Sequence, residues 1–220
     1  MEFPNYDVFD YIVVGSGPAG AVIAKILSDD KKTSVLVLEA GDNNDRDIPI
    51  QDSRFAPELE EKYFLQYFWQ GEGVPQEGVD DRTFEWTTGR LSGGGSSING
   101  EQYVRPTPSV LQNWERLLGR RWGPNQAIRN FKEMEKFLGT TENPNYHGYS
   151  GRLHIRQAPA NPTNVSKKVV RAISEAAGVE IIDDYNDPST PIGAFTQWQL
   201  FQNPMEEGRV LPLHFYPRTL

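Results

Sequence analysis

Three glycines near the N-terminus stand at the spacing that phosphate-binding turns use. Gly15, Gly17 and Gly20 form a Gly-x-Gly-x-x-Gly pattern. The first glycine permits a sharp turn, the second lets the backbone approach a pyrophosphate, and the third lets a helix pack closely on a strand. Glu39 follows 19 residues after the third glycine. A carboxylate at that distance can hydrogen-bond an adenosine ribose and would repel a 2′-phosphate. These residues predict a dinucleotide site that disfavours NADP.

A strand, a helix and a second strand must position these glycines. Residues 11–14 form a short apolar run, typical of a strand buried on both faces of a parallel sheet. Residues 18–27 carry an apolar helical stripe, and a second apolar run at 35–38 ends at Glu39. The start of the helix would offer free N–H groups and the positive end of its dipole to a pyrophosphate. The order predicts a Rossmann-like βαβ unit; a chance glycine turn is the alternative, and the fold alone does not separate FAD from NAD.

A second glycine cluster lies at residues 93–97, with the sequence Gly-Gly-Gly-Ser-Ser. A flexible linker would have this composition. However, Trp86 and Tyr103 flank the cluster, and no Gly/Ser/Pro-rich stretch extends on either side. A bare backbone that presses against a flat ligand is therefore the preferred interpretation.

Together the two clusters resemble the GMC (glucose-methanol-choline) oxidoreductases, a family of flavoenzymes. The first signature of this family is a glycine- and serine-rich segment that ends in asparagine and is followed by an aromatic residue. It is matched here by Gly89, Arg90, Gly93, Gly94, Gly95, Ser96, Ile98, Asn99, Tyr103 and Pro106, while Ser92 departs from the usual aliphatic residue. The resemblance implies FAD as cofactor, bound by Gly15, Ser16, Gly17, Pro18, Ala19, Gly20, Glu39, Ala40, Arg90, Gly94, Gly95, Ser96, Asn99 and Gly100.

The resemblance also predicts how the cofactor is attached. Some members of the family link FAD to a histidine just before the signature asparagine. Ile98 stands at that position here, so non-covalent FAD is expected. The first forty residues look most like GMC-type proteins of giant viruses, which suggests an association with a virus.

The rest of the chain resembles the beginning of the family's substrate domain. Three helices are predicted from their caps and apolar faces: one from Thr107-Pro108 to Gly119, one from 122–124 to Gly139, and one from residues 163–164 to Gly178. A loop at 146–152 leads into a short strand. We expect residues 1–106 to form the N-terminal part of an FAD domain and 107–220 to open an α+β substrate domain, with a divergent tail at 211–220. The fold class is α/β with an incomplete Rossmann-like domain.

Composition excludes several other classes of function. The chain of 220 residues carries a net charge of −8, so a nucleic-acid partner is not expected. It has no cysteine, which excludes disulfides, thiolate metal sites and cysteine nucleophiles. Residues 1–7 lack a basic, apolar secretory signal, and no apolar run is long enough for a bilayer. We expect no membrane span and assign no metal ligands.

No catalytic residue is assigned. Enzymes of this family take the alcohol proton with a histidine that is paired with another histidine or an asparagine, in a C-terminal half that this sequence does not match. The three histidines are His147, His154 and His214. In the family the His147 loop is structural, and alternation with Leu153 and Ile155 places His154 on the polar face of a strand. His214 lies in the divergent tail.

Four functions remain open from the sequence. The preferred one is a truncated GMC-type chain that binds FAD but does not catalyse alcohol oxidation by itself. The chain could instead form an enzyme completed in trans by a C-terminal half, a non-enzymatic interaction protein, or a simple NAD-binding domain.

With only two parallel strands predicted in the nucleotide domain, the isolated chain should be marginally stable. Exposure of the aromatic segment 63–69 would then favour self-association.

Overall fold

The computed structural model describes residues 8–43, 50, 64–159, 161–189, 192–203 and 208–209. The chain divides into two compact units, one formed by residues 1–100 with 211–220 and the other by residues 101–210. The tail at 211–220 with His214, and Phe55 and Tyr63 of the aromatic stretch, lie outside the described residues.

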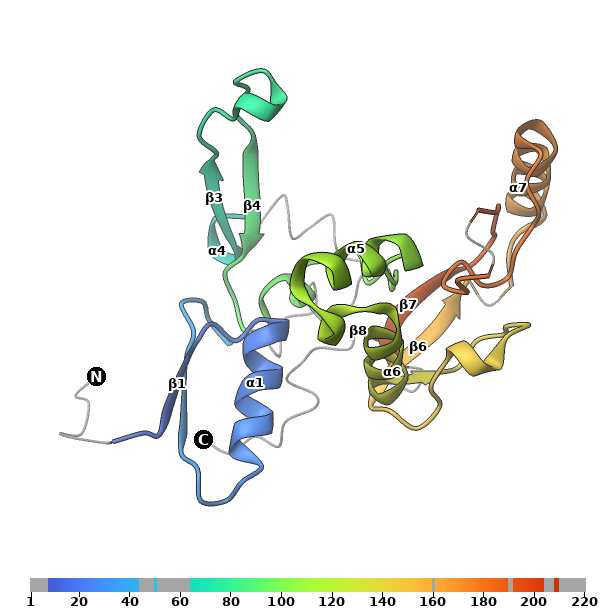
Figure 1. Cartoon of the computed structure of the whole chain (residues 1–220). Helices are drawn as coiled ribbons and strands as arrows, with labels where there is room; N and C mark the ends of the chain where they lie inside the picture. The colour runs from blue at the N-terminus through green and yellow to red at the C-terminus, as the bar shows by residue number, and fades with distance from the viewer. Residues whose placement is uncertain are drawn as a thin grey trace. The chain divides into compact units, whose positions relative to one another are not determined.

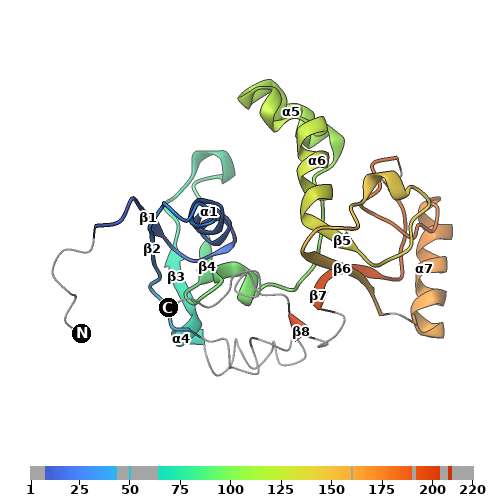
Figure 2. The same ribbon diagram turned by 90° about the horizontal axis from the view of Figure 1, so that it is seen from below.

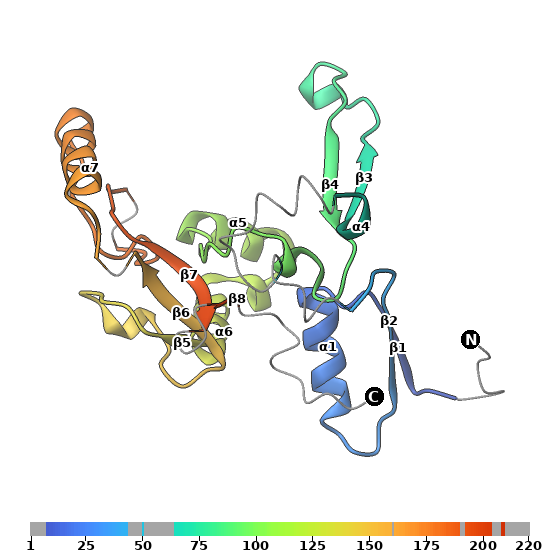
Figure 3. The same ribbon diagram turned by 180° about the vertical axis from the view of Figure 1, so that it is seen from behind.

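The first unit begins with the predicted strand, helix and strand. Strand β1 (Tyr11–Val14) pairs in parallel with β2 (Val35–Leu38), so that Tyr11 lies opposite Val35 and Val14 opposite Leu38. Helix α1 (Pro18–Ser28) connects them and runs alongside both strands (Figures 1 and 3). The βαβ prediction is confirmed.

The expectation that the first strand is buried on both faces is wrong for this chain. Ile12 is 60% exposed and Val14 is 82% exposed. The reason is that β1 and β2 make a sheet of only two strands among the described residues. Among the described residues of helix α1, Ala21 is the only buried one. The apolar side chains of β1 and α1 are thus left as an uncovered surface.

A hairpin follows and leads into the second glycine cluster. A single helical turn, α4 (Phe64–Tyr67), precedes strand β3 (Phe68–Glu72), which pairs antiparallel with β4 (Glu85–Gly89). A 3-10 turn, η2 (Glu77–Val79), lies at the tip (Figure 1). The glycine cluster forms the 3-10 turn η3 (Gly94–Ser97).

A small core anchors this hairpin. It consists of Ile50, Tyr67 and Leu91, with Phe68 and Ile98 packed against it. Tyr67 is therefore buried, whereas Trp69 of the same aromatic stretch is about half exposed. The core fixes Leu91, two residues before the glycine cluster, and thereby limits where that cluster can lie.

The second unit contains the predicted helices. They are α5 (Pro108–Leu118), α6 (Pro124–Met134) and α7 (Asn164–Ala177), with a 3-10 turn η4 (Arg120–Trp122) between the first two. Thr163 caps α7 by accepting a hydrogen bond from the Ser166 amide, and Gly178 ends it at a φ of 65°. Gly119 ends α5, as predicted.

The second helix was predicted to continue to Gly139, and this is wrong. It stops at Met134, and residues Glu135–Phe137 form strand β5, which pairs in parallel with β6 (Leu153–Ala158). Packing overrides helical periodicity here, because Phe137 enters a core with Tyr103 and Ile155.

Two further strands complete this sheet, whose order is β5-β6-β7-β8 (Figure 2). Strand β7 (Trp198–Asn203) lies antiparallel between β6 and the short β8 (Gly208–Arg209), and a 3-10 turn, η5 (Pro144–Tyr146), precedes His147. In the described part of the chain, no helix has the length and apolar character needed to cross a bilayer.

Candidate dinucleotide site

The turn between β1 and α1 has the backbone shape that its glycines allow. Gly15 adopts a φ of +91°, a conformation that side chains of L-residues disfavour, and its amide donates to the Leu38 carbonyl at 2.7 Å. A Cβ at Gly20 would lie 2.0 Å from the Gly15 carbonyl oxygen, which no packed structure tolerates. The glycines at both positions are therefore required for this turn.

The N-terminal end of α1 is left open by its own sequence. Gly17 is the N-cap and supplies no capping side chain, and Pro18 has no amide hydrogen. The first intrahelical bond runs from the Ala21 amide to the Gly17 carbonyl at 2.9 Å. The Ala19 and Gly20 amides therefore precede the helical hydrogen-bond ladder and face outward with the positive end of the helix dipole.

Glu39 lies at the carboxyl end of β2, beside this turn. Its Oε2 accepts hydrogen bonds from the Ser16 amide at 2.8 Å and the Ser16 hydroxyl at 2.7 Å, and its Oε1 accepts from the Gly41 amide at 2.9 Å. Burial alone would raise the pKa of Glu39, but these donors and the Ala40 amide outweigh it, so the pKa lies below the usual value. The carboxylate stays ionised and is ready to accept hydrogen bonds.

The second glycine cluster lies directly against the first. A Cβ at Gly94, whose φ is +53°, would lie 2.9 Å from the Gly17 Cα. The Gly93 amide also donates to the Ser16 hydroxyl at 3.4 Å. The cluster is thus part of a folded site, and the alternative of a flexible linker is wrong.

The site can be tested for its fit to a bulky phosphate-bearing ligand. A Cβ at Gly15 or at Gly95 would meet no described atom within 4 Å, so free space lies above both backbones. The Arg90 guanidinium stacks over Trp69 at 4.7 Å, and its buried Nε has no hydrogen-bond partner among the described residues. Open glycines, exposed helix amides and an unsatisfied cationic donor fit an anionic nucleotide such as the ADP half of FAD.

The other residues predicted to bind FAD lie in or next to the two glycine clusters. The Ser96 hydroxyl donates to the Gly93 carbonyl at 2.6 Å, and the Asn99 amide donates to the Gly95 carbonyl at 2.9 Å. The other positions are exposed on the surface of the first unit: Pro18, Ala19, Ala40, Asn99 and Gly100.

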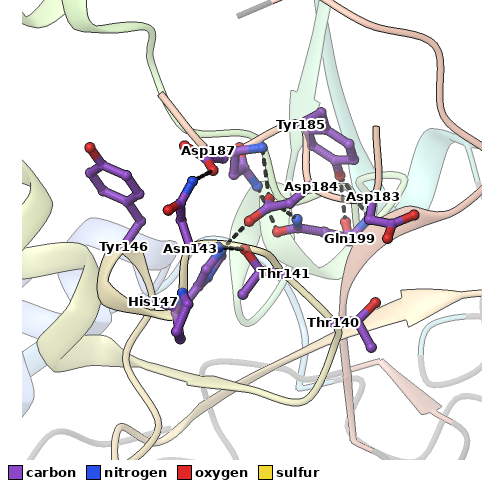
Figure 4. A network of polar contacts seen from close by, with 12 residues as sticks. Thr140, Thr141, Asn143, Tyr146, His147, Asp183, Asp184, Tyr185, Asp187 and Gln199 are labelled. Atoms are coloured by element: carbon purple, nitrogen blue, oxygen red, sulfur yellow. Dashed lines mark hydrogen bonds and ion pairs between the residues drawn. The ribbon is translucent and has the colours of Figure 1, made fainter. Parts of the chain in front are cut away.

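The second unit holds a buried polar network that sequence reasoning missed (Figure 4). His147 lies between two carboxylates: its Nδ1 is 3.0 Å from Glu135 Oε1 and its Nε2 is 2.7 Å from Asp184 Oδ2. Arg105 also contacts Glu135 Oε1, at 2.6 Å. Glu135 is fully buried and Asp184 is 5% exposed. Two buried anions are therefore matched by two cations when His147 is protonated.

Protonation of His147 follows from this geometry. Burial opposes its charged form, but hydrogen bonds and charges from Asp184 and Glu135 outweigh burial and raise the pKa of the imidazole. The same interactions, with those of Arg105, lower the pKa of Glu135 against its own burial. Since both ring nitrogens donate to carboxylates, His147 has no nitrogen left to accept a proton. The role of His147 is therefore structural.

The network extends to amide and phenol groups. The Asn186 side chain donates to the Tyr103 carbonyl at 2.9 Å and to the Gln199 side chain at 2.8 Å, and the Arg105 amide donates to Asn186 at 2.7 Å. Burial raises the pKa of Tyr185 to about 12. No short sequence pattern signals these partners, because they come from segments up to 83 residues apart. Among the described residues, no group of acidic and histidine side chains is arranged to hold a metal ion.

Known proteins are similar to this chain in sequence and in fold. A family model for GMC oxidoreductases matches residues 9–197. An oxygen-dependent choline dehydrogenase of Sinorhizobium fredii is 33% identical over 180 residues, covering 80% of this chain and 31% of the relative. An alcohol dehydrogenase (acceptor) of Pseudomonas putida is also 33% identical over 180 residues, with 81% and 31% covered.

A solved structure has the same fold. The crystal structure of pyridoxine 4-oxidase from Mesorbium loti superposes with a TM-score of 0.77 at 27% identity, and the match covers 94% of this chain and 38% of that one. The chain spans about a third of the length of these curated relatives. The family match, the two adjoining glycine clusters and the placement of Glu39 agree with one another: the chain belongs to the GMC oxidoreductase family.

Proposed function

We propose that this chain binds FAD non-covalently through the ADP half of the cofactor, as the N-terminal part of a GMC-type alcohol oxidoreductase. The observation that carries the proposal is the contact of the two glycine clusters, Gly94 against Gly17, beside open space at Gly15 and Gly95. Membership of the GMC oxidoreductase family supports the same assignment.

Each part of the site has a role in this binding. The Ala19 and Gly20 amides at the start of α1 bind the pyrophosphate, Glu39 accepts a hydrogen bond from the adenosine ribose, and Arg90 supplies positive charge. The side-chain-free backbone at Gly94 and Gly95 admits the flat cofactor. When bound, FAD supplies the chemistry of accepting a hydride from an alcohol carbon. Ile98 offers no nucleophile for a covalent link.

Residues 1–220 alone do not oxidise an alcohol in this account. Proton removal from an alcohol needs a base with a free lone pair. His147 is buried and gives both ring nitrogens to carboxylates. His154 is half-buried on β6, with no partner that would activate it in the described part of the chain. We therefore assign the base to a segment other than the described residues.

A second candidate function is an enzyme completed in trans by a C-terminal half. The observation that favours it is the uncovered apolar surface of β1 and α1, where Val14 and Ile26 are more than two-thirds exposed. The same surface favours self-association of the chain or a non-enzymatic role in binding another protein.

The first test is to express residues 1–220, purify the protein and record its visible spectrum, with mass identification of any released cofactor. A flavin spectrum with free FAD, and no bleaching on addition of choline or a simple alcohol, is the expected result. A protein that stays colourless after incubation with FAD would contradict the proposed function. Alcohol-dependent bleaching would contradict the assignment of catalysis to other residues.

A further inference from the structure

Ser16 lies between Gly15 and Gly17 in the glycine turn and makes hydrogen bonds to two residues outside that turn, Glu39 and Gly93. Both its amide and its hydroxyl donate to the same oxygen, Oε2 of Glu39, at 2.8 and 2.7 Å. Its hydroxyl oxygen then accepts the Gly93 amide at 3.4 Å. Ser16 is 8% exposed. A single buried hydroxyl thus joins the two glycine clusters and the acidic residue.

These contacts fix how the Glu39 carboxylate can receive a ligand. A carboxylate offers about four acceptor positions. Ser16 fills two of them on Oε2 and Gly41 fills one on Oε1. The Ala40 amide also lowers the pKa of Glu39 but is not among these three donors, so one position on Oε1 is open among the described residues. A ligand that donates one hydroxyl hydrogen meets a carboxylate whose rotation is already restricted. Restricting a group in its bound orientation before binding increases affinity.

We propose that Ser16 is a positioning residue that orients Glu39 toward a hydroxyl of the adenosine ribose and couples this contact to the second glycine cluster through Gly93. The inference rests on the proposed FAD site and deepens it. Specificity for a ribose diol then depends on a residue that itself touches no part of the ribose.

A similar serine–carboxylate pair, Ser34 and Asp10, lies at the opposite end of the same two strands and provides a control substitution. The Ser34 amide and hydroxyl both donate to Oδ2 of Asp10, each at 2.8 Å. This pair repeats the Ser16–Glu39 geometry at the amino ends of β1 and β2. Ser34→Ala removes an equivalent hydroxyl from the sheet without touching either glycine cluster.

The test is a double-mutant cycle on the full chain with Ser16→Ala and Glu39→Gln, with ADP and 2′,3′-dideoxy-ADP as titrants in calorimetry. A hydrogen bond to a charged group is stronger than one between neutral groups, and the Ser16 amide keeps one of the two. We therefore expect Ser16→Ala to weaken ADP binding about tenfold and dideoxy-ADP binding less than twofold. In the Glu39→Gln background, Ser16→Ala should change ADP binding less than twofold, and Ser34→Ala should change neither ligand.

A second readout separates positioning from a general structural effect. Carbon-13 NMR of the Glu39 side chain should show its pKa rise toward the usual value in Ser16→Ala and stay lowered in Ser34→Ala. Ser16→Thr, which keeps the hydroxyl, should restore both ADP affinity and the lowered pKa.

Three results would overturn the inference, and they are distinguishable from failure of the proposed function. Equal losses for ADP and dideoxy-ADP in Ser16→Ala would assign the serine to folding of the turn. Additive effects of the two substitutions would show that Ser16 does not act through Glu39. If the wild-type chain binds neither FAD nor ADP, the proposed function fails and this inference fails with it.

Discussion

The glycine clusters of the first unit and the His147 network of the second unit handle buried polarity in opposite ways. The glycine clusters present exposed amides at the start of α1, open space above Gly15 and Gly95, and an Arg90 Nε without a partner among the described residues. In the network, His147 donates from both ring nitrogens, and the Asn186 side chain donates to two different acceptors.

The difference separates a binding site from a structural one. Groups left open cost stability unless a ligand satisfies them, whereas groups bonded to one another hold their own segments together. His147 is bonded at both ring nitrogens, although Glu135 Oε2 is buried without a hydrogen-bond partner among the described residues. Shifted pKa values alone would have marked the His147 network as the functional site, since such shifts are common at functional sites. The pKa of His147 is raised and those of Glu135 and Asp184 are lowered. The satisfied hydrogen bonds decide that this histidine is structural.

The largest effect is expected from removing the central cation of the network. His147→Ala leaves Glu135 and Asp184 buried with one cation fewer, which should lower the free energy of unfolding of the second unit by about 3–5 kcal/mol. Urea denaturation followed by tryptophan fluorescence measures it. His154→Ala on β6 is the control and should cost less than about 1 kcal/mol. Equal effects from the two substitutions would mean that the network does not stabilise this unit.

The second effect concerns the open site. Gly95→Val places a side chain in space where its Cβ meets no described atom, so the fold should tolerate it. FAD affinity should fall about a hundredfold, because the branched side chain occupies room that the ligand needs. Gly78 on the hairpin also has open space around it, and Gly78→Val is the control. Isothermal titration calorimetry with FAD measures the affinity of both variants. Unchanged affinity in Gly95→Val would place the cofactor elsewhere.

The third effect is a dependence on pH that belongs to the second unit. The folded pKa of His147 is raised above 6.5, so its stabilising contribution is complete below pH 6.5 and is lost as the pH rises through the folded value. The pKa values of Glu135 and Asp184 are lowered from 4.5 and 3.8, so their contribution is lost as the pH falls below these values. Urea midpoints between pH 2 and 9 should fall at both ends in wild type.

A variant identifies the group behind the alkaline decline. In His147→Gln the alkaline loss of stability should disappear while the acid loss remains. An alkaline decline of the same size in the variant would assign it to other groups.

The smallest effect is expected at the stacked arginine. Trp69→Ala removes the ring under the Arg90 guanidinium, an interaction that contributes about 0.5–1 kcal/mol at a partly exposed position. FAD affinity should fall about threefold, as measured by quenching of flavin fluorescence. Trp86→Ala, on the neighbouring strand of the hairpin, is the control. A loss in Trp86→Ala as large as in Trp69→Ala would mean that the hairpin as a whole, and not the stacked arginine, supports binding.

The sequence predicted those elements whose signals are local. Thr163 and Gly178 bound α7 by short-range capping geometry, and the glycine turn required no distant information. The end of α6 at Met134 depended on pairing of β5 with β6, 18 residues further along the chain, and helical periodicity concealed it. The exposure of β1 depended on how many strands cover it, which a buried-strand pattern cannot report.

The site shows the same division. Gly15, Gly17, Gly20 and Glu39 could be assigned from spacing, because a phosphate-binding turn is a local structure. The contact of Gly94 with Gly17, and the two bonds from Ser16 to Glu39, join segments 77 and 23 residues apart. Nothing in residue type alone distinguishes a serine that bonds a carboxylate from one that is merely small.

Nuclear magnetic resonance can map FAD binding onto the glycine clusters and the His147 network in one experiment. Backbone amide chemical shifts of the labelled 220-residue chain would be recorded while FAD is added. We expect large shifts at residues 15–20, 39–41 and 93–97, and none at residues 143–149 and 184–199. Shifts concentrated around His147, or no shifts at either glycine cluster, would contradict this expectation.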